Sequence, residues 1–104
     1  MSKLSPARKL ALDVLMEADR RGMYARDVLS SRASAKAIDQ RDSAFAARLA
    51  LGVAATQGIL DELLDQFLDK PKKVAPRARM ALRISAFEML YLHTPGRVAV
   101  SQGV

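Results

Sequence analysis

Hydrophobic residues recur at helical spacing along most of the chain. The first apolar stripe comprises Leu10, Ala11, Val14, Leu15 and Ala18. Ser5 and Pro6 precede this stripe as an N-cap residue and a first-turn proline, both of which are favoured at helix starts. Gly22 follows it, at a position where glycine commonly ends a helix. The pattern predicts a first helix from Pro6 to the residue before Gly22.

A shorter apolar pattern follows the first one. It predicts a second helix near Tyr24–Ser31, in which Val28 and Leu29 are buried. Residues 32–38 carry no comparable pattern and are expected to form a loop.

The longest pattern occupies the middle of the chain. Its stripe comprises Phe45, Leu49, Val53, Thr56, Leu60, Leu63 and Phe67. The helical phase is preserved across Gly52 and Gly58, although each glycine costs about 1 kcal/mol relative to alanine. We therefore expect one long helix over about residues 40–68, capped by Asp39, with the glycines permitting close approach of a neighbouring helix.

Two segments complete the pattern. Residues 69–73 are predicted to form a basic loop, followed by a fourth helix from Pro76 to His93. After the Thr94-Pro95-Gly96 stop signal, residues 98–104 begin a further amphipathic segment. A helix this short has no stability of its own, so the segment either packs on the body or belongs to something longer.

Composition supports an all-α fold and excludes several kinds of site. The 104 residues include five glycines, four prolines, one histidine and no cysteine, and half of them are apolar. This favours a single helical domain over residues 1–104, without disulfides, thiol chemistry, cysteine zinc sites or a His–His metal pair. No uninterrupted apolar run approaches the roughly 18 residues of a membrane span, and no signal peptide is apparent. We expect a cytoplasmic protein with no membrane partner.

The charge is unevenly distributed along the chain. The net charge of +6 divides into +4 over residues 1–36, −3 over residues 37–70 and +5 over residues 71–104. Basic outer segments around an acidic middle make nucleic acid a candidate partner. The alternative is a solvated basic surface.

Basic residues occur where helix stability alone would place acidic ones. Arg8 and Lys9 lie in the first predicted helix turn, and Arg77 and Arg79 in the first turn of the fourth helix. Cations are disfavoured there by up to about 1 kcal/mol each, whereas free backbone N–H groups with cations suit a phosphate. The candidate RNA-binding residues are Arg8, Lys9, Lys72, Lys73, Arg77, Arg79 and Arg83. Alternatively, these side chains lie over the core with their charged ends in solvent.

Catalytic patterns are lacking in the sequence. We find no phosphate-binding glycine loop, nucleophile elbow or metal-ligand spacing, so no catalytic residue, metal or cofactor is expected. His93 is best interpreted as a cation favoured by a helix C-terminus. Asp61 and Asp65 are expected on a solvated face, and the aromatic residues mostly in the core rather than stacked on bases.

The ordered segments resemble the NusB-like RNA-binding domain. The resemblance is carried by Arg8-x-x-Ala11-x-x-Val14-Leu15, Asp42 with Gly52-Val53, Leu60-Asp61, Leu82-Arg83-Ile84, Glu88-Met89-Leu90-Tyr91 and Pro95-x-x-Val98-Ala99-Val100. Such domains occur in the antitermination factor NusB and at the N-terminus of RsmB-type rRNA cytosine-C5 methyltransferases.

The resemblance implies a compact helical bundle of about five helices. It places Arg8 and Lys9 in the RNA-contacting region and gives Arg83 and Glu88 a structural role. Ser43 and Arg48 depart from the family pattern, which puts one intramolecular charge contact in doubt. The family also continues for some thirty to forty residues, so the resemblance implies a domain lacking its C-terminal helix.

Three hypotheses follow for function. The first is an RNA-binding module that orients structured rRNA for a C-terminal methyltransferase domain; the chain itself has no cysteine or cofactor loop for that chemistry. The second is a free-standing NusB-type antitermination factor that binds RNA and a ribosomal protein. The third, of another class, is a helical module that docks onto a protein partner or forms a homodimer.

Overall fold

The computed structural model describes residues 5–35 and 39–92, of which residues 33–35 are described by their backbone alone. The regular secondary structure of these residues is helical, without a strand, which confirms the all-α prediction. The elements are α1 (Pro6–Arg21), α2 (Ala25–Ala35), α3 (Gln40–Phe67), the short 3-10 helix η1 (Pro71–Lys73) and α4 (Pro76–Tyr91).

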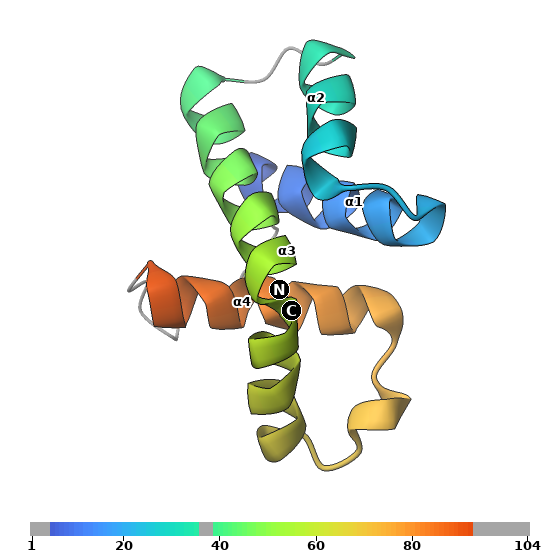
Figure 1. The fold of residues 1–104 in the computed structure, drawn as a ribbon. Helices are drawn as coiled ribbons and strands as arrows, with labels where there is room; N and C mark the ends of the chain where they lie inside the picture. The colour runs from blue at the N-terminus through green and yellow to red at the C-terminus, as the bar shows by residue number, and fades with distance from the viewer. Residues whose placement is uncertain (1–4, 36–38, 93–104) are drawn as a thin grey trace.

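The long helix α3 organises the molecule. It contacts α1, α2 and α4, and α1 also contacts α2 and α4. Figure 1 shows α3 in front of α1 and α4, with both helices crossing behind it, while α2 runs beside its upper half. The core therefore lies between α3 and the α1–α4 pair.

The core is built from the predicted stripes. In α1 the five stripe residues are buried, together with Ala7 and Leu12. Val28 of α2 is fully buried, and Leu29 packs against the core from a half-buried position. The α3 contribution comprises Ala46, Leu49, Ala50, Val53 and Leu60, and the apolar α4 contribution Met80, Ala81, Ile84, Ala86 and Phe87.

The predicted ends of α1 are confirmed. The Ser5 side chain accepts a hydrogen bond from the Arg8 backbone N–H at 3.3 Å, and Pro6 occupies the first turn. Gly22 adopts a left-handed conformation with φ of 63°, and its N–H donates to carbonyls of the last turn. This φ suits glycine, which has no Cβ to clash there.

Three predicted boundaries are wrong. The second helix extends to Ala35, so residues 32–35 are helical rather than part of a loop. The basic segment after α3 contains η1 over Pro71–Lys73 instead of an irregular loop. The fourth helix ends at Tyr91, two residues before the predicted end. His93 and the amphipathic segment 98–104 lie outside the described residues.

The prediction of one uninterrupted α3 is confirmed, but the two glycines differ. A Cβ on Gly52 would clash with the Phe87 ring, so α3 and α4 approach closely there. A Cβ on Gly58 would meet nothing within 4 Å. The prediction of close helix packing is right for Gly52 and wrong for Gly58.

Within residues 5–35 and 39–92, one helix, α3, has the length and hydropathy of a membrane span. Its 28 residues include an 18-residue window with a mean hydropathy of 1.3. The helix is, however, packed on all three other described α-helices. This central position accounts for only part of its apolar character, because 28% of the window is buried.

Three aromatic side chains lie on the surface, contrary to the prediction that most belong to the core. Phe67 is 77% exposed, Tyr24 is 73% exposed and Tyr91 is 43% exposed. Phe87 is buried and stacks on Tyr91 with ring centroids 5.1 Å apart, and Phe45 packs against the core. Phe67 extends beyond the part of α3 that the other helices cover.

Candidate nucleic-acid interface

Arg8, the first candidate RNA ligand, is a structural residue in this fold. Its Nε donates to Glu88 Oε2 at 2.8 Å, and its Nη2 donates to the other carboxylate oxygen. The Glu88 side chain is fully buried and the Arg8 side chain is 13% exposed. A bidentate pair of this kind joins α1 to α4 with both carboxylate oxygens occupied.

The helix start around Arg8 is also less open than predicted. Ser5 accepts hydrogen bonds from the Arg8 backbone and from its guanidinium Nη1, and the guanidinium lies 5.3 Å from the centre of the Phe45 ring. The Arg8 guanidinium is therefore paired within the fold, so the α1 start is not the open cationic site that the sequence suggested, and contact of Arg8 with RNA stays a prediction. The structural role implied for Glu88 is confirmed.

Arg79 and Arg83 are likewise held by carboxylates. Arg83 makes a bidentate contact to Asp61, with distances of 2.7 and 2.9 Å. Arg79 donates to Asp65 at 2.7 Å and to the Pro71 carbonyl at 2.9 Å. Asp61 and Asp65, which we expected on a solvated face, thus connect α3 to α4.

The two candidate basic clusters do not form one track. Arg8 contacts Glu88, which lies twelve residues after Pro76, the start of α4. At a rise of 1.5 Å per residue, this separates the contact from the α4 start by about 18 Å. In Figure 1, α1 begins at its left-hand end, behind α3, whereas α4 begins at its right-hand end. An RNA strand cannot contact both clusters through adjacent phosphates.

The remaining candidates gather mainly at one end of α4. Lys72 and Lys73 are exposed on η1, and Arg77 is 54% exposed, with one 3.2 Å contact to Asp13 of α1. Lys70, also exposed, belongs to the same corner and was missed as a site residue, although it stands in the same basic run. We call Lys70, Lys72, Lys73 and Arg77 the η1–α4 corner. Lys9 is exposed in the first turn of α1, away from the η1–α4 corner.

The backbone at the η1–α4 corner is suited to an anion. The N-cap residue of α4 is Ala75, whose side chain forms no cap hydrogen bond, and the first turn contains no acidic residue. The N–H groups of a first helix turn lack intrahelical partners and carry partial positive charge. Three lysines and one largely exposed arginine around such a turn form an electropositive surface.

Another charged cluster was not anticipated from the sequence. Glu17 of α1 accepts from Arg32 Nε at 2.9 Å and from Arg21 at 2.8 Å. The hydrogen bonds from Arg32 and then Arg21 lower the pKa of the Glu17 carboxyl below its ordinary value of 4.5. The cluster ties α2 to α1. Its only local signal is the Glu17–Arg21 spacing.

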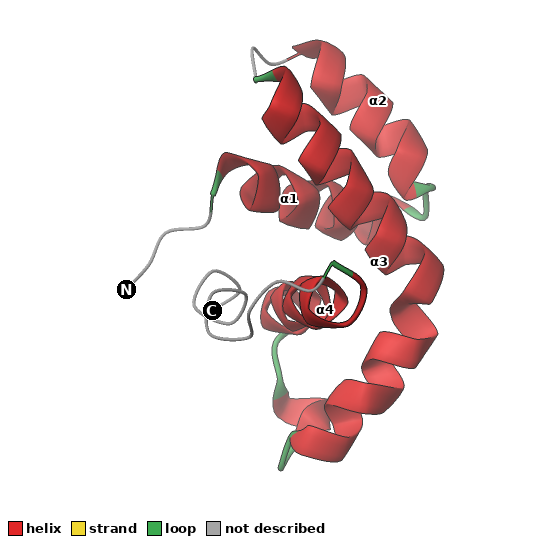
Figure 2. Cartoon of the chain, turned by 90° about the vertical axis from the view of Figure 1, so that its left-hand side faces the viewer, coloured by secondary structure: helices red, strands yellow, loops and turns green. Residues whose placement is uncertain are grey.

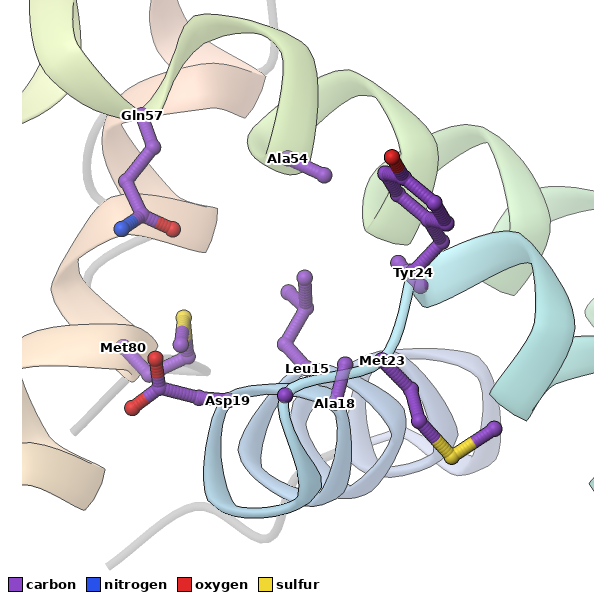
Figure 3. Close-up of a pocket in the computed structure, with 10 residues that line it drawn as sticks. Leu15, Ala18, Asp19, Met23, Tyr24, Ala54, Gln57 and Met80 are labelled. Carbon is purple, nitrogen blue, oxygen red and sulfur yellow. The ribbon is translucent and has the colours of Figure 1, made fainter.

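A pocket of about 290 Å³ lies between α1, α3, α4 and the turn before α2. Figure 3 shows Leu15, Ala54, Tyr24 and Met80 around it, with Asp19 and Gln57 at one side. The lining is largely apolar and contains a single carboxylate. Among the described residues, no group of three or more His, Cys, Asp or Glu could hold a metal ion.

Comparison with known proteins identifies the family. The model of the NusB family matches residues 5–104. The chain belongs to the NusB family. No solved structure matches it significantly.

The relatives include both kinds of NusB-domain protein. The chain is 40% identical to a transcription antitermination protein NusB of Cutibacterium acnes, of which it spans 40%, and 36% identical to one of an Arthrobacter strain, of which it spans 77%. Both matches cover this whole chain. It is also 30% identical, over 97% of its length, to a putative methyltransferase of Mycobacterium tuberculosis, of which it spans 22%.

These comparisons change the order of the functional hypotheses. Similarity to NusB antitermination proteins is higher than to the methyltransferase, and it extends over a larger share of the Arthrobacter relative. The expectation that the chain is first of all a methyltransferase module is therefore not favoured. The NusB alternative has the better support.

Proposed function

We propose that this chain is an RNA-binding domain of a cytoplasmic NusB-type transcription antitermination protein, with the η1–α4 corner in contact with RNA phosphates. The observation that carries the proposal is the NusB family match over residues 5–104. The corner supports it, because Lys72, Lys73 and Arg77 surround an uncapped helix start. The domain binds RNA and performs no catalysis of its own. A ribosomal protein as a second partner belongs to the same proposal.

Titration of a structured rRNA fragment with the purified protein tests this function. The variant K72Q/K73Q removes two positive charges from the corner, and both side chains are exposed, so folding is preserved. We expect its affinity to fall at least about tenfold at low salt, since each lost phosphate contact weakens binding. The control R41Q removes an exposed charge at the start of α3, far from the corner, and is expected to bind nearly as the unchanged protein.

The methyltransferase module is a second candidate, favoured by the 30% identity to the M. tuberculosis protein. Under that hypothesis the RNA-binding role is the same, but the chain serves a catalytic domain. The coding sequence downstream of residue 104 separates the two. A cysteine-bearing domain with an S-adenosylmethionine loop would establish the methyltransferase branch, and a stop codon within about forty residues would establish NusB.

A further inference from the structure

The outer face of α3 is exposed on the side opposite the core. Its central residues are apolar or small and its end residues are charged. We call Arg48, Leu51, Ala55, Gly58, Ile59 and Glu62 the α3 outer face. Leu51 is 42% exposed and Ile59 is 57% exposed. Figure 2 shows α1 and α4 on the other side of α3. Exposed apolar side chains arranged in a continuous stripe indicate an interaction surface.

The α3 outer face is symmetric about Ala55. Leu51 and Ile59 lie four residues before and after it, and Arg48 and Glu62 lie seven residues before and after it. Residues at these spacings share one side of a helix. An antiparallel second copy, with a twofold axis at Ala55, therefore places each Leu51 against Ile59 of the other copy. The same arrangement places each Arg48 against Glu62 of the other copy.

The surface relief agrees with this pairing. Ala55 lies at the axis, and open space surrounds the Gly58 Cα, so a second helix can approach closely. Beside Leu51 lies an open hollow of about 370 Å³, bordered by Tyr24 in the turn before α2, by Arg26 of α2 and by Ala54. In the antiparallel pairing this hollow faces Ile59 of the second copy. The Ile59 side chain of the second copy thereby packs into a partly preformed hollow.

The charge pattern of this face fits a second copy as the occupant. Within the described part of the chain, neither Arg48 nor Glu62 takes part in a salt bridge, whereas the nearby Asp61 and Asp65 are paired with α4 arginines. Arg48 stands at one end of the apolar stripe and Glu62 at the other. Of the two orientations in which a second copy can pack on this face, only the antiparallel one brings opposite charges together at both ends.

We propose that the α3 outer face is a homodimer interface, in which two copies pack α3 against α3 in antiparallel orientation about Ala55. The interface is isologous, so each residue contact occurs twice. It does not involve the η1–α4 corner. Dimerisation and RNA binding can therefore be lost independently.

Charge reversal combined with sedimentation velocity tests the proposal. R48E and E62R each place like charges opposite one another, and we expect each to raise the dimer dissociation constant at least about tenfold at low salt. The double variant R48E/E62R restores opposite charges and is expected to dimerise nearly as the unchanged protein. The two positions lie about 21 Å apart within one helix, so a contact inside one chain cannot explain restoration.

A cysteine at the axis provides a second readout. The chain contains no cysteine, so oxidation of A55C can form only an intermolecular disulfide. We expect A55C to cross-link rapidly. The matched control A44C, also exposed on α3, lies about 33 Å from its counterpart in the proposed dimer and is expected not to cross-link.

Three results would overturn the proposal. The first is a monomeric protein at concentrations of about 0.1 mM, near the range of weak specific interfaces. The second is a double charge variant as weakened as the single ones. The third is cross-linking of A44C at the rate of A55C.

Discussion

The contact between Arg8 and Glu88 changes the meaning of a cation at a helix start. From sequence, the arginine conflicts with the helix dipole and suggests an external anion. In the fold, the anion is a fully buried carboxylate eighty residues away in the chain. Local position shows that Arg8 requires a negative partner, but only the packing of α1 on α4 shows which one.

Replacement of Arg8 by methionine is expected to destabilise the protein strongly. R8M leaves Glu88 buried without its bidentate partner, and the loss of one member of a buried pair typically costs about 3–5 kcal/mol. Urea unfolding monitored by circular dichroism measures the free energy of unfolding.

The double variant R8M/E88M provides the control. It replaces both charges by apolar groups of similar length and is expected to recover most of that loss. An R8M protein within about 0.5 kcal/mol of the unchanged one would contradict the structural role of the pair.

The Glu17 cluster gives a pH dependence with a definite sign. Because hydrogen bonds from Arg32 and Arg21 lower the pKa of Glu17 in the folded state, the unfolded chain binds this proton more readily. The stabilisation is present above the ordinary pKa of 4.5 and is lost as the pH falls through the folded-state pKa. E17Q is expected to lower the melting temperature at pH 7, and the difference from the unchanged protein is expected to shrink at acid pH. A difference that grows towards low pH would have the wrong sign.

At the scale of elements, the two glycines of α3 offer a pair of variants that can be compared directly. G52A places a methyl group against the buried Phe87 ring, which is also stacked on Tyr91, so either the ring or the helix has to move. We expect destabilisation by about 1–3 kcal/mol, despite the better helix propensity of alanine. G58A meets no neighbour within its own chain and, at concentrations below those at which the proposed dimer forms, is expected to stabilise the fold by up to about 1 kcal/mol. Thermal or urea unfolding of both variants measures the contrast, and equal effects would contradict the close α3–α4 packing.

The sequence predicted the ends of a helix well where residues close to that end determine it. Ser5, Pro6 and Gly22 mark the ends of α1 through hydrogen bonds and a backbone conformation within a few residues. The end of α2 carries no such marker, and Pro71 in the first turn of η1 also fits the loop that we predicted there. Phe67 continues the helical period of the α3 stripe, yet it is exposed because no described helix covers that end of α3. Periodicity defines a helix face but not how far a neighbouring helix extends along it.

At the scale of the molecule, the sequence likewise could not show which candidate site residues are paired with carboxylates in the fold. The sequence correctly indicated the NusB family and a basic chain. It could not distinguish Arg79 and Arg83, which join α4 to acidic residues of α3, from Lys72 and Lys73, which stay exposed. This distinction depends on which carboxylates the packing of α4 on α3 brings close. The acidic half of α3 thus stabilises the fold, and the η1–α4 corner is left as the proposed contact to RNA.

The salt dependence of RNA affinity tests this central claim most directly. The slope of the logarithm of the binding constant against the logarithm of salt concentration reports the number of phosphate contacts. For K72Q/K73Q we expect a slope shallower by about two than that of the unchanged protein, whereas R41Q keeps the original slope. A slope unchanged in K72Q/K73Q would contradict the assignment of the η1–α4 corner as the phosphate-binding surface.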